Sequence, residues 1–317
     1  MQDQGQTARR YNIATLSILT IVVVSAAGLG GQTQEFRARN NERALVVSVL
    51  DQDGKPVQGL SPIDFVVEED GAEREVLSAA RATAAMQLAI LVDTSGAAAF
   101  ATRDVRDGLT TFVSDLHEGN EISLVTFGGA PRILVESTRR LERLQDGIGR
   151  VFAFPNTAAY LLDSLLETTR GFERRASPRP VIVVVTSEGI DYSNNHSRRV
   201  LEALQSNQVP THVIVIRDGA GSIRRGDWIS NGELEYNLHQ RDLVLAQGPK
   251  MTGGQRRDLL ISSALGNTLS LLSKILSNQY DVVYSRPTRL IPPDQISVRT
   301  RRSDLTVRAT PVRQPGD

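Results

Sequence analysis

The chain has 317 residues, of which 40% are hydrophobic and 23% charged, a composition typical of a folded globular protein. Basic and acidic side chains number 36 each, so the net charge of zero gives no general attraction to nucleic acid or to an anionic membrane surface. The sequence contains no cysteine, which excludes disulfides, thiolate nucleophiles and cysteine-based metal sites. Any bound metal must therefore be held by oxygen or imidazole ligands.

The amino-terminal segment has the order of a secretory signal peptide. Arg9 and Arg10 precede an uncharged stretch, residues 11–34, whose apolar centre IATLSILTIVVV is followed by the small-residue run SAAGLGG. The uncharged length is also just sufficient to span a bilayer. We predict that residues 1–31 are a cleaved signal peptide, with an uncleaved membrane anchor as the alternative, and that residues 32–43 are a linker. The protein would then be exported, either periplasmic or secreted, or would contact a membrane only through this segment.

The two ends of the remaining chain have the pattern of short antiparallel strands. Residues 44–82 alternate apolar and polar side chains in VVSVL and DFVVEE, with glycine and proline clusters between them, and predict a small β module. Residues 279–317 alternate again, and the seven arginines and two aspartates between residues 286 and 313 are interpreted as a solvated sheet face because no aromatic residues are interleaved. A lone hairpin is marginal in water, so we expect the two segments to pack together.

Residues 86–278 alternate between strand and helix patterns. MQLAILVD is a continuous apolar run typical of a strand buried on both faces, and an amphipathic helix is predicted at residues 103–116. Strands are predicted at EISLVTFG, PRILVES, RPVIVVVTS and THVIVIRDG. Helices are predicted at residues 141–151, 157–172, 197–204 and 258–276, and a further helix is predicted to end at residue 246. Residues 219–237 are predicted to form an exposed loop. The fold class is therefore α/β, with a doubly wound, mostly parallel sheet flanked by small antiparallel β segments at both ends.

The loop after the first strand of this α/β region has the sequence DTSGA, residues 93–97, and lies where open parallel sheets bind ligands. It resembles the DxSxS metal-adhesion signature of von Willebrand factor A domains. Together with VSVLDQDGKPVQGLSPIDFVVEEDG, LVDTSG, KMTGG and NQYDVVYSRP, it makes most of residues 44–308 similar to the bacterial VWFA-related family described in acidobacterial proteins. The resemblance implies a von Willebrand factor A-like fold and a protein-binding role in adhesion or assembly.

The resemblance also implies a magnesium site made by three loops. Asp93 and Ser95 match the first loop, and Thr157 matches the second-loop threonine. Glu188 stands where the third loop should have an aspartate, and Ala97 stands where a second serine should supply an oxygen. Magnesium demands near-octahedral geometry, so this degenerate site is expected to bind Mg²⁺ weakly or not at all. The double change of Ala97→Ser with Glu188→Asp is expected to strengthen binding.

Other residues of the same loops are candidates for contact with a partner. Thr94, Gly96, Ala97 and Asp191 are assigned to partner-binding loops, and Asp191 ranks behind Glu188 as a possible metal carboxylate. The alternative interpretation needs no metal. In it, Asp93 caps the following loop through backbone amides, and the hydroxyl groups nearby form only local hydrogen bonds.

No catalytic motif supports an enzyme. Ser95 interrupts the Asp-Thr-Gly run of aspartic proteases and a second copy is missing, while GPKMTGG lacks the GxxxxGK[ST] pattern of a phosphate-binding loop. The sequence has neither HExxH nor GxSxG. We therefore predict a non-enzymatic adhesion or assembly module of the bacterial cell envelope that recognises an unidentified protein partner, and not nucleic acid, through the loops above the sheet. The alternative is a metal-free structural scaffold in an envelope complex.

Overall fold

The computed structural model describes residues 41–217, 231–287, 291, 293 and 295–312, which all belong to one compact unit. The predicted signal peptide or anchor at residues 1–31 lies outside the described residues, as does nearly all of the predicted linker. Among the helices of the described residues, none is both long enough and apolar enough to cross a membrane.

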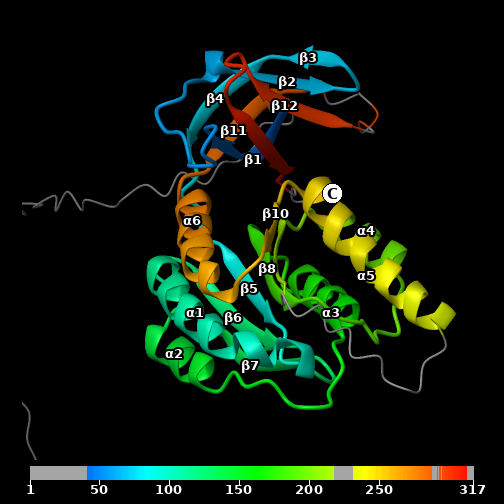
Figure 1. Cartoon of the computed structure of the whole chain (residues 1–317). Coiled ribbons are helices and arrows are strands. Elements are labelled where there is room, and N and C mark those ends of the chain that lie inside the picture. The colour runs from blue at the N-terminus through cyan, green and yellow to red at the C-terminus, as the bar shows by residue number, and fades with distance from the viewer. Residues whose placement is uncertain (1–40, 218–230, 288–290, 292, 294, 313–317) are drawn as a thin grey trace, which may run out of the picture. The chain divides into compact units, whose positions relative to one another are not determined.

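A six-stranded sheet forms the centre of the α/β part (Figure 1). Its order is β10-β9-β8-β5-β6-β7, and every neighbouring pair is parallel except β6 with the edge strand β7. The apolar runs of β5, β8 and β9 are buried almost throughout because helices cover both faces. The strands are β5 (Gln87–Val92), β6 (Glu121–Thr126), β7 (Arg132–Thr138), β8 (Pro180–Ser187), β9 (Thr211–Ile216) and β10 (Arg256–Leu259).

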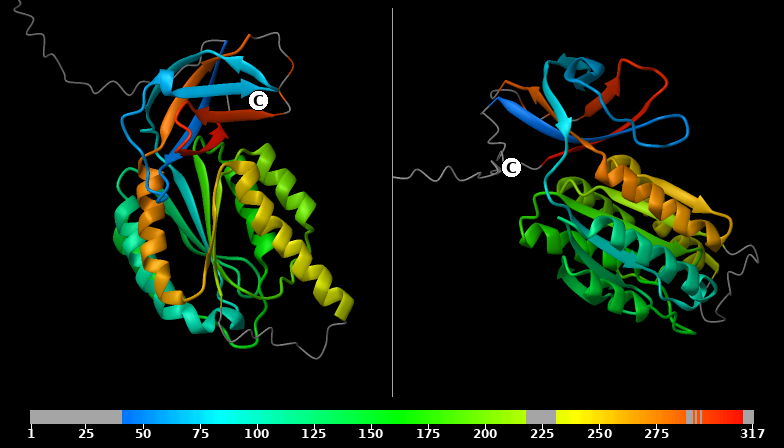
Figure 2. Two further views of the ribbon diagram at one scale, coloured as in Figure 1. Left: turned by 45° about the horizontal axis from the view of Figure 1, so that its top comes forward. Right: turned by 90° about the vertical axis from the view of Figure 1, so that its left-hand side faces the viewer.

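Helices of the described residues pack on both faces of this sheet (Figure 2). The first face carries α1 (Thr102–Leu116), α2 (Leu141–Gly149) and α6 (Leu265–Ser277), with the short 3₁₀ turns η2 (Gly96–Ala101) and η3 (Ser262–Ala264). The second carries α3 (Leu161–Arg174), α4 (Ser197–Ser206) and α5 (Asn231–Thr252). Leu109 and Phe112 of α1 are fully buried, so the amphipathic pattern of this helix places its apolar side on the sheet.

The segments at the two ends of the described chain form two facing antiparallel sheets, which are called the sandwich below. One sheet has the order β13-β1-β11-β4 and the other β12-β2-β3. Their facing side chains, including Val47, Phe65 and Tyr284, form a third core. The strands are β1 (Glu42–Leu50), β2 (Phe65–Glu69), β3 (Ala72–Arg74), β4 (Val76–Arg81), β11 (Tyr280–Ser285), β12 (Ile296–Thr300) and β13 (Thr306–Pro311), with the 3₁₀ turn η1 (Pro62–Asp64) before β2. Strands from residues 44–82 and 279–317 thus share both sheets, and the α/β part lies between β4 and β11 in the chain.

The chain from residue 231 to 265 differs from the sequence expectation. Helix α5 begins at Asn231, within the predicted loop 219–237, and continues through Pro249 to Thr252. Residues 256–259 form strand β10, where the start of a helix was predicted, because their backbone pairs with β9 along the open edge of the sheet. Helix α6 begins only at Leu265. The apolar pattern of this segment extends over too few residues to distinguish helix from strand. The pairing of residues 256–259 with β9 determines their conformation.

The two glycines of the KMTGG run are required by close backbone approaches. Gly253 ends α5 with a φ of 76°, and a Cβ placed on it would lie 2.4 Å from the carbonyl oxygen of Ala309 in β13. A Cβ on Gly254 would lie 2.0 Å from the carbonyl oxygen of Thr211 in β9. The run therefore allows the α5–β10 connection to pass against strands of both the sandwich and the central sheet.

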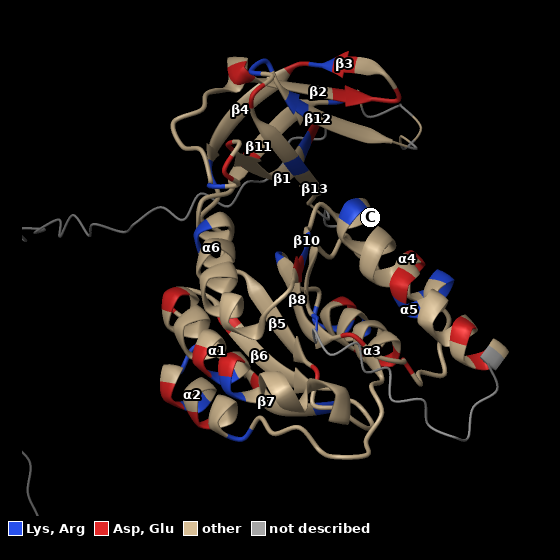
Figure 3. Ribbon diagram, in the orientation of Figure 1, with Lys and Arg blue, Asp and Glu red and all other residues tan. Residues whose placement is uncertain are grey.

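Three described arginines near the carboxyl terminus are paired with acidic residues. Arg286 contacts Glu69 at 3.1 Å, Arg299 contacts Glu68 at 2.7 Å, and Arg302 contacts Asp304 at 2.8 Å. Charges of both signs are interspersed over the outer helices as well (Figure 3). Two of these pairs involve acidic residues of β2, which offset part of the excess of arginine in residues 286–313.

Candidate functional site

The candidate site lies at the carboxyl edge of the central sheet, between β5 and β8. The chain moves from β5 through α1 to β6 on one side, and from β8 through α4 to β9 on the other side. The strand order therefore reverses between β5 and β8, which is where open α/β sheets bind their ligands. The loops that follow β5 and β8, and the loop that precedes α3, meet at this edge.

Asp93 joins the ends of the two central strands. Its side chain is 7% exposed, and Oδ1 accepts a hydrogen bond from the amide of Ser95 at 2.9 Å. Oδ2 accepts from Thr186 Oγ1 at 2.9 Å, from the Ser187 amide at 3.2 Å and from Ser187 Oγ at 3.1 Å. The carboxylate thus caps its own loop through an amide and also fixes the end of β8.

Backbone hydrogen bonds hold the second loop against the first. The amide of Phe154 donates to the Thr94 carbonyl at 2.9 Å, and the amide of Gly96 donates to the Thr157 carbonyl at 3.1 Å. Thr94 Oγ1 accepts from the amide of Gly128, at the end of β6, at 3.0 Å. The hydroxyl of Thr157 donates to the Phe154 carbonyl of its own loop at 2.8 Å. These contacts bring the first-loop residues and Thr157 together, as the sequence predicts for loops of one sheet edge.

The third loop approaches the first through small residues, while its acidic residues have other partners. A Cβ on Gly189 would lie 3.4 Å from the Cβ of Ala97, so there is contact but no oxygen at that position. The carboxylate of Glu188 is 45% exposed and lies 3.4 Å from Nε of Arg217. Asp191 is buried, and its Oδ2 accepts from the Leu161 amide at 2.6 Å. Asp191 therefore caps the start of α3.

Asp191 is a buried carboxyl group whose surroundings act on its pKa in both directions. Burial raises the pKa above its ordinary value, whereas hydrogen bonds from Ser193 and from the Leu161 amide, together with the charge of Arg241, lower it. The Ser193 amide donates to Oδ1 at 3.0 Å. These amide contacts are those of a local cap rather than of a ligand-facing carboxylate.

Arg241 is a part of this edge that no sequence motif indicates. It lies on α5 and is 4% exposed. Its Nη2 donates to Thr186 Oγ1 at 3.2 Å and to the Ser187 carbonyl oxygen. Because Thr186 in turn donates to Asp93, guanidinium, hydroxyl and carboxylate form one chain of hydrogen bonds. Sequence reasoning missed Arg241, since it reaches the site only through the packing of α5 on the sheet.

The donor set does not fit a magnesium ion. The Asp93 carboxylate already accepts four hydrogen bonds, Ala97 supplies no oxygen, and Glu188 is paired with Arg217. Ser95 Oγ is buried without a hydrogen-bond partner, but one free hydroxyl does not make the near-octahedral shell that Mg²⁺ demands. Within the described residues, no three His, Cys, Asp or Glu side chains gather in a way that could hold a metal.

Aromatic side chains flank the same loops and are open to solvent. Phe100 on η2 is 42% exposed, Phe152 is 52% exposed and Phe154 is 54% exposed. The guanidinium of Arg106 lies 3.8 Å from the ring centre of Phe152, and its Nε donates to the Val151 carbonyl at 2.7 Å. The edge therefore offers large apolar groups on a hydrogen-bonded platform.

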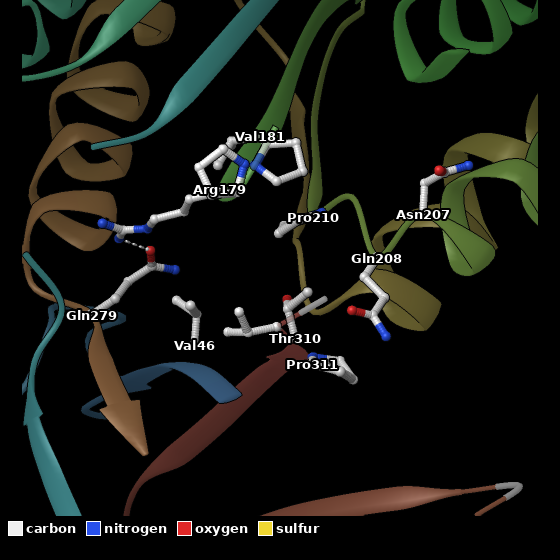
Figure 4. Close-up of a pocket in the computed structure, with 12 residues that line it drawn as sticks. Val46, Arg179, Val181, Asn207, Gln208, Pro210, Gln279, Thr310 and Pro311 are labelled. Carbon is white, nitrogen blue, oxygen red and sulfur yellow. Dashed lines mark hydrogen bonds between the residues drawn. The ribbon is translucent and has the colours of Figure 1, made fainter. Parts of the chain in front are cut away.

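A small cavity between the amino ends of the central strands and β13 is not a ligand site (Figure 4). Its volume is about 30 Å³, which is room for about one water molecule. Arg179 points along its wall and donates to Gln279 Oε1 at 2.7 Å. Arg179 Nε and Gln208 Oε1 are buried there without protein partners, so the cavity suits a bridging water.

A family model described as von Willebrand factor type A domain matches residues 88–190. No curated protein gives a significant match to the chain. Among solved structures, BatB from Bacteroides thetaiotaomicron is 13% identical, with 61% of this chain and 100% of that chain covered and a TM-score of 0.44. A von Willebrand factor type A protein from Catenulispora acidiphila is 12% identical, with 89% and 68% covered and a TM-score of 0.46.

The vWF domain of the type V pili tip protein Mfa5 from Porphyromonas gingivalis is a further match among solved structures. It is 11% identical, with 62% of this chain and 96% of that chain covered and a TM-score of 0.41. Similarity at this level assigns neither a function nor a partner to the chain.

Proposed function

We propose that this chain, which carries a von Willebrand factor type A domain, is a non-enzymatic protein-binding module that recognises its partner through the loops at the carboxyl edge of the central sheet. Domains of this type are in general interaction modules without catalytic activity. The carboxylates of this edge are engaged in hydrogen bonds or an ion pair with protein groups, which supports a role in binding.

The observation that supports this proposal best is the exposed aromatic group on a rigid platform. Phe152 and Phe154 are about half exposed, and the loop that bears them is tied to the first loop by two backbone hydrogen bonds. Aromatic residues are enriched in protein interfaces, where a few of them contribute most of the binding energy. A platform that is already ordered lowers the entropy cost of association.

The proposed location is the cell envelope. It is supported by the charged start, apolar centre and small-residue exit of residues 9–31, which have the order of an export signal. Export would give the domain access to envelope or extracellular proteins, whether the segment is cleaved or retained as an anchor. The partner itself is not identified by any contact in the structure.

The experiment is affinity capture from an envelope extract of the source organism with the full chain as bait. The wild type is compared with Phe152→Ser/Phe154→Ser and with the control Ile63→Ser, which removes a side chain that is 77% exposed on η1 of the sandwich. We expect the same protein to be captured by the wild type and the control but not by the double variant. Thermal unfolding of all three checks that they are folded.

Capture that survives the double variant but is lost in the Ile63→Ser control would contradict the proposal. It would instead favour the scaffold alternative, with the sandwich as the contact surface. The two variants are well matched because all three side chains are exposed and none lies in a described core cluster.

A further inference from the structure

Arg241 places a positive charge close to the loops onto which the family's metal site maps. The guanidinium lies behind the ends of β5 and β8, and it reaches Asp93 through the hydroxyl of Thr186. It also donates to the backbone carbonyl of Ser187, the last residue of β8 before the third loop. A single side chain from α5 thus contacts the residue that precedes the third loop and, through one hydroxyl, the first-loop carboxylate.

The charges around Arg241 show that it serves more than one buried acid. Asp93 and Asp191 are 7% and 4% exposed, and a buried carboxylate is costly unless it has hydrogen bonds and a counter-charge. Burial lowers the pKa of Arg241, while the negative charges of Asp93, Asp242 and Asp191 raise it. Its Nη1 also lies 3.8 Å from Oδ1 of the exposed Asp242, so the guanidinium acts on two buried acidic residues of this edge and on one exposed residue.

We infer that Arg241 is the built-in cation of the site, which takes over the charge-balancing and loop-fixing role of a divalent ion and makes the edge independent of metal. A guanidinium one hydroxyl away from a carboxylate repels a divalent cation bound to that carboxylate, most strongly where water is excluded. This inference explains two features together. Residue 97 supplies no ligand oxygen, and the positive charge that a metal ion would provide comes from the buried Arg241.

This inference concerns the edge that the proposed function assigns to partner binding. Only one consequence of the inference rests on the proposed function, namely that partner capture needs no metal. Metal binding and thermal stability are measured on the chain alone. A failure to capture a partner therefore leaves the inference standing, and evidence of metal binding leaves the proposed protein-binding function standing.

The test is a set of variants titrated with Mg²⁺ and Mn²⁺ by calorimetry and followed by thermal unfolding with and without chelator. The sequence alone predicts stronger binding by Ala97→Ser/Glu188→Asp, whereas this inference predicts that the double variant, which retains Arg241, binds neither ion measurably, like the wild type. Each of these two proteins is expected to unfold at the same temperature with and without chelator. Adding Arg241→Met to the double variant removes the charge but keeps much of the side-chain length. We expect this triple variant to bind Mn²⁺ at least about tenfold more tightly and to be stabilised by it.

Arg179→Met, added to Ala97→Ser/Glu188→Asp, is the matched control, because Arg179 is a buried arginine (8% exposed) that donates to Gln279 near the opposite ends of the strands. It is expected to be destabilised without any response to metal, which separates loss of a buried arginine from loss of the proposed cation. If the triple variant does not fold, Arg241→Gln replaces Arg241→Met, since it keeps a donor without the charge.

Two results would overturn the inference. One is tight binding of Mg²⁺ or Mn²⁺ by the wild type or by Ala97→Ser/Glu188→Asp, because Arg241 would then not exclude a metal. The other is a folded triple variant whose Mn²⁺ affinity and unfolding temperature do not differ from those of the double variant. Because the double variant retains Arg241, its metal titration tests the inference even when every change at residue 241 prevents folding.

Discussion

Replacing Thr186 by Val tests whether one hydroxyl couples Arg241 to Asp93. Thr186 is 1% exposed, and its Oγ1 donates to Asp93 at 2.9 Å and accepts from Arg241 at 3.2 Å. Val has nearly the same shape, so the change leaves the packing intact and removes only the hydroxyl. Each hydrogen bond to a charged group contributes about 1.5–3 kcal/mol. Asp93 and Arg241 both keep other partners, so we expect a total loss of about 3 kcal/mol.

The control for this change is Thr169→Val in α3. Thr169 is fully buried, and its hydroxyl donates at 2.7 Å to the neutral carbonyl of Leu165. Its loss is expected to cost about 1 kcal/mol. Urea denaturation of the two variants and the wild type, with the free energies of unfolding compared, measures the difference. A Thr186→Val cost no larger than that of Thr169→Val would refute the view that this hydroxyl links two buried charges.

Three further predictions concern the loop edge, a buried histidine and the amino terminus. Gly128→Ala would place a Cβ 2.2–2.4 Å from backbone atoms of Thr94 and Ser95, so denaturant unfolding should show a stability loss of about 1–3 kcal/mol or more. The control Gly149→Ala, whose Cβ would have no atom within 4 Å, should not destabilise the protein. Burial lowers the pKa of His212 from 6.5 to about 4, so below pH 6.5 the unfolded chain takes up a proton at this residue and the folded chain does not. The free energy of unfolding should therefore fall by about 2 kcal/mol between about pH 7 and pH 5 because of this group. The variant His212→Leu should not show this loss. Mass spectrometry of the natural product should place the mature amino terminus between about residues 27 and 35, while an intact Met1 in a membrane fraction would support the anchor instead.

The strands of the central sheet were predictable because their signal is local. MQLAILVD and RPVIVVVTS are unbroken apolar runs, and such runs occur in strands covered on both faces. The position of Asp93 at a carboxyl edge followed from the same reasoning, since the polar loop comes directly after a buried strand. The von Willebrand factor A-like fold, expected from the order of these elements and from the resemblance, is the fold that the structure has.

Other features depended on contacts that no local pattern encodes. Strand β10 exists because β9 leaves an open edge beside residues 256–259, and their charged sequence RRDL alone gives no strand signal. The Glu188 carboxylate pairs with Arg217, which is distant in sequence. Arg241 belongs to the site only because α5 packs on the sheet, and the sequence around it has no motif. Whether the site binds metal stays a prediction.

Hydrogen–deuterium exchange of the full chain, with and without the partner captured from the envelope extract, tests most directly whether this edge is a metal-independent binding surface. We predict that the partner slows exchange in the loops at residues 94–101, 152–158 and 188–193, with or without chelator, and leaves the sandwich strands unchanged. Slower exchange confined to the sandwich, or protection of the loops that disappears when chelator is added, would contradict a metal-independent binding surface at this edge.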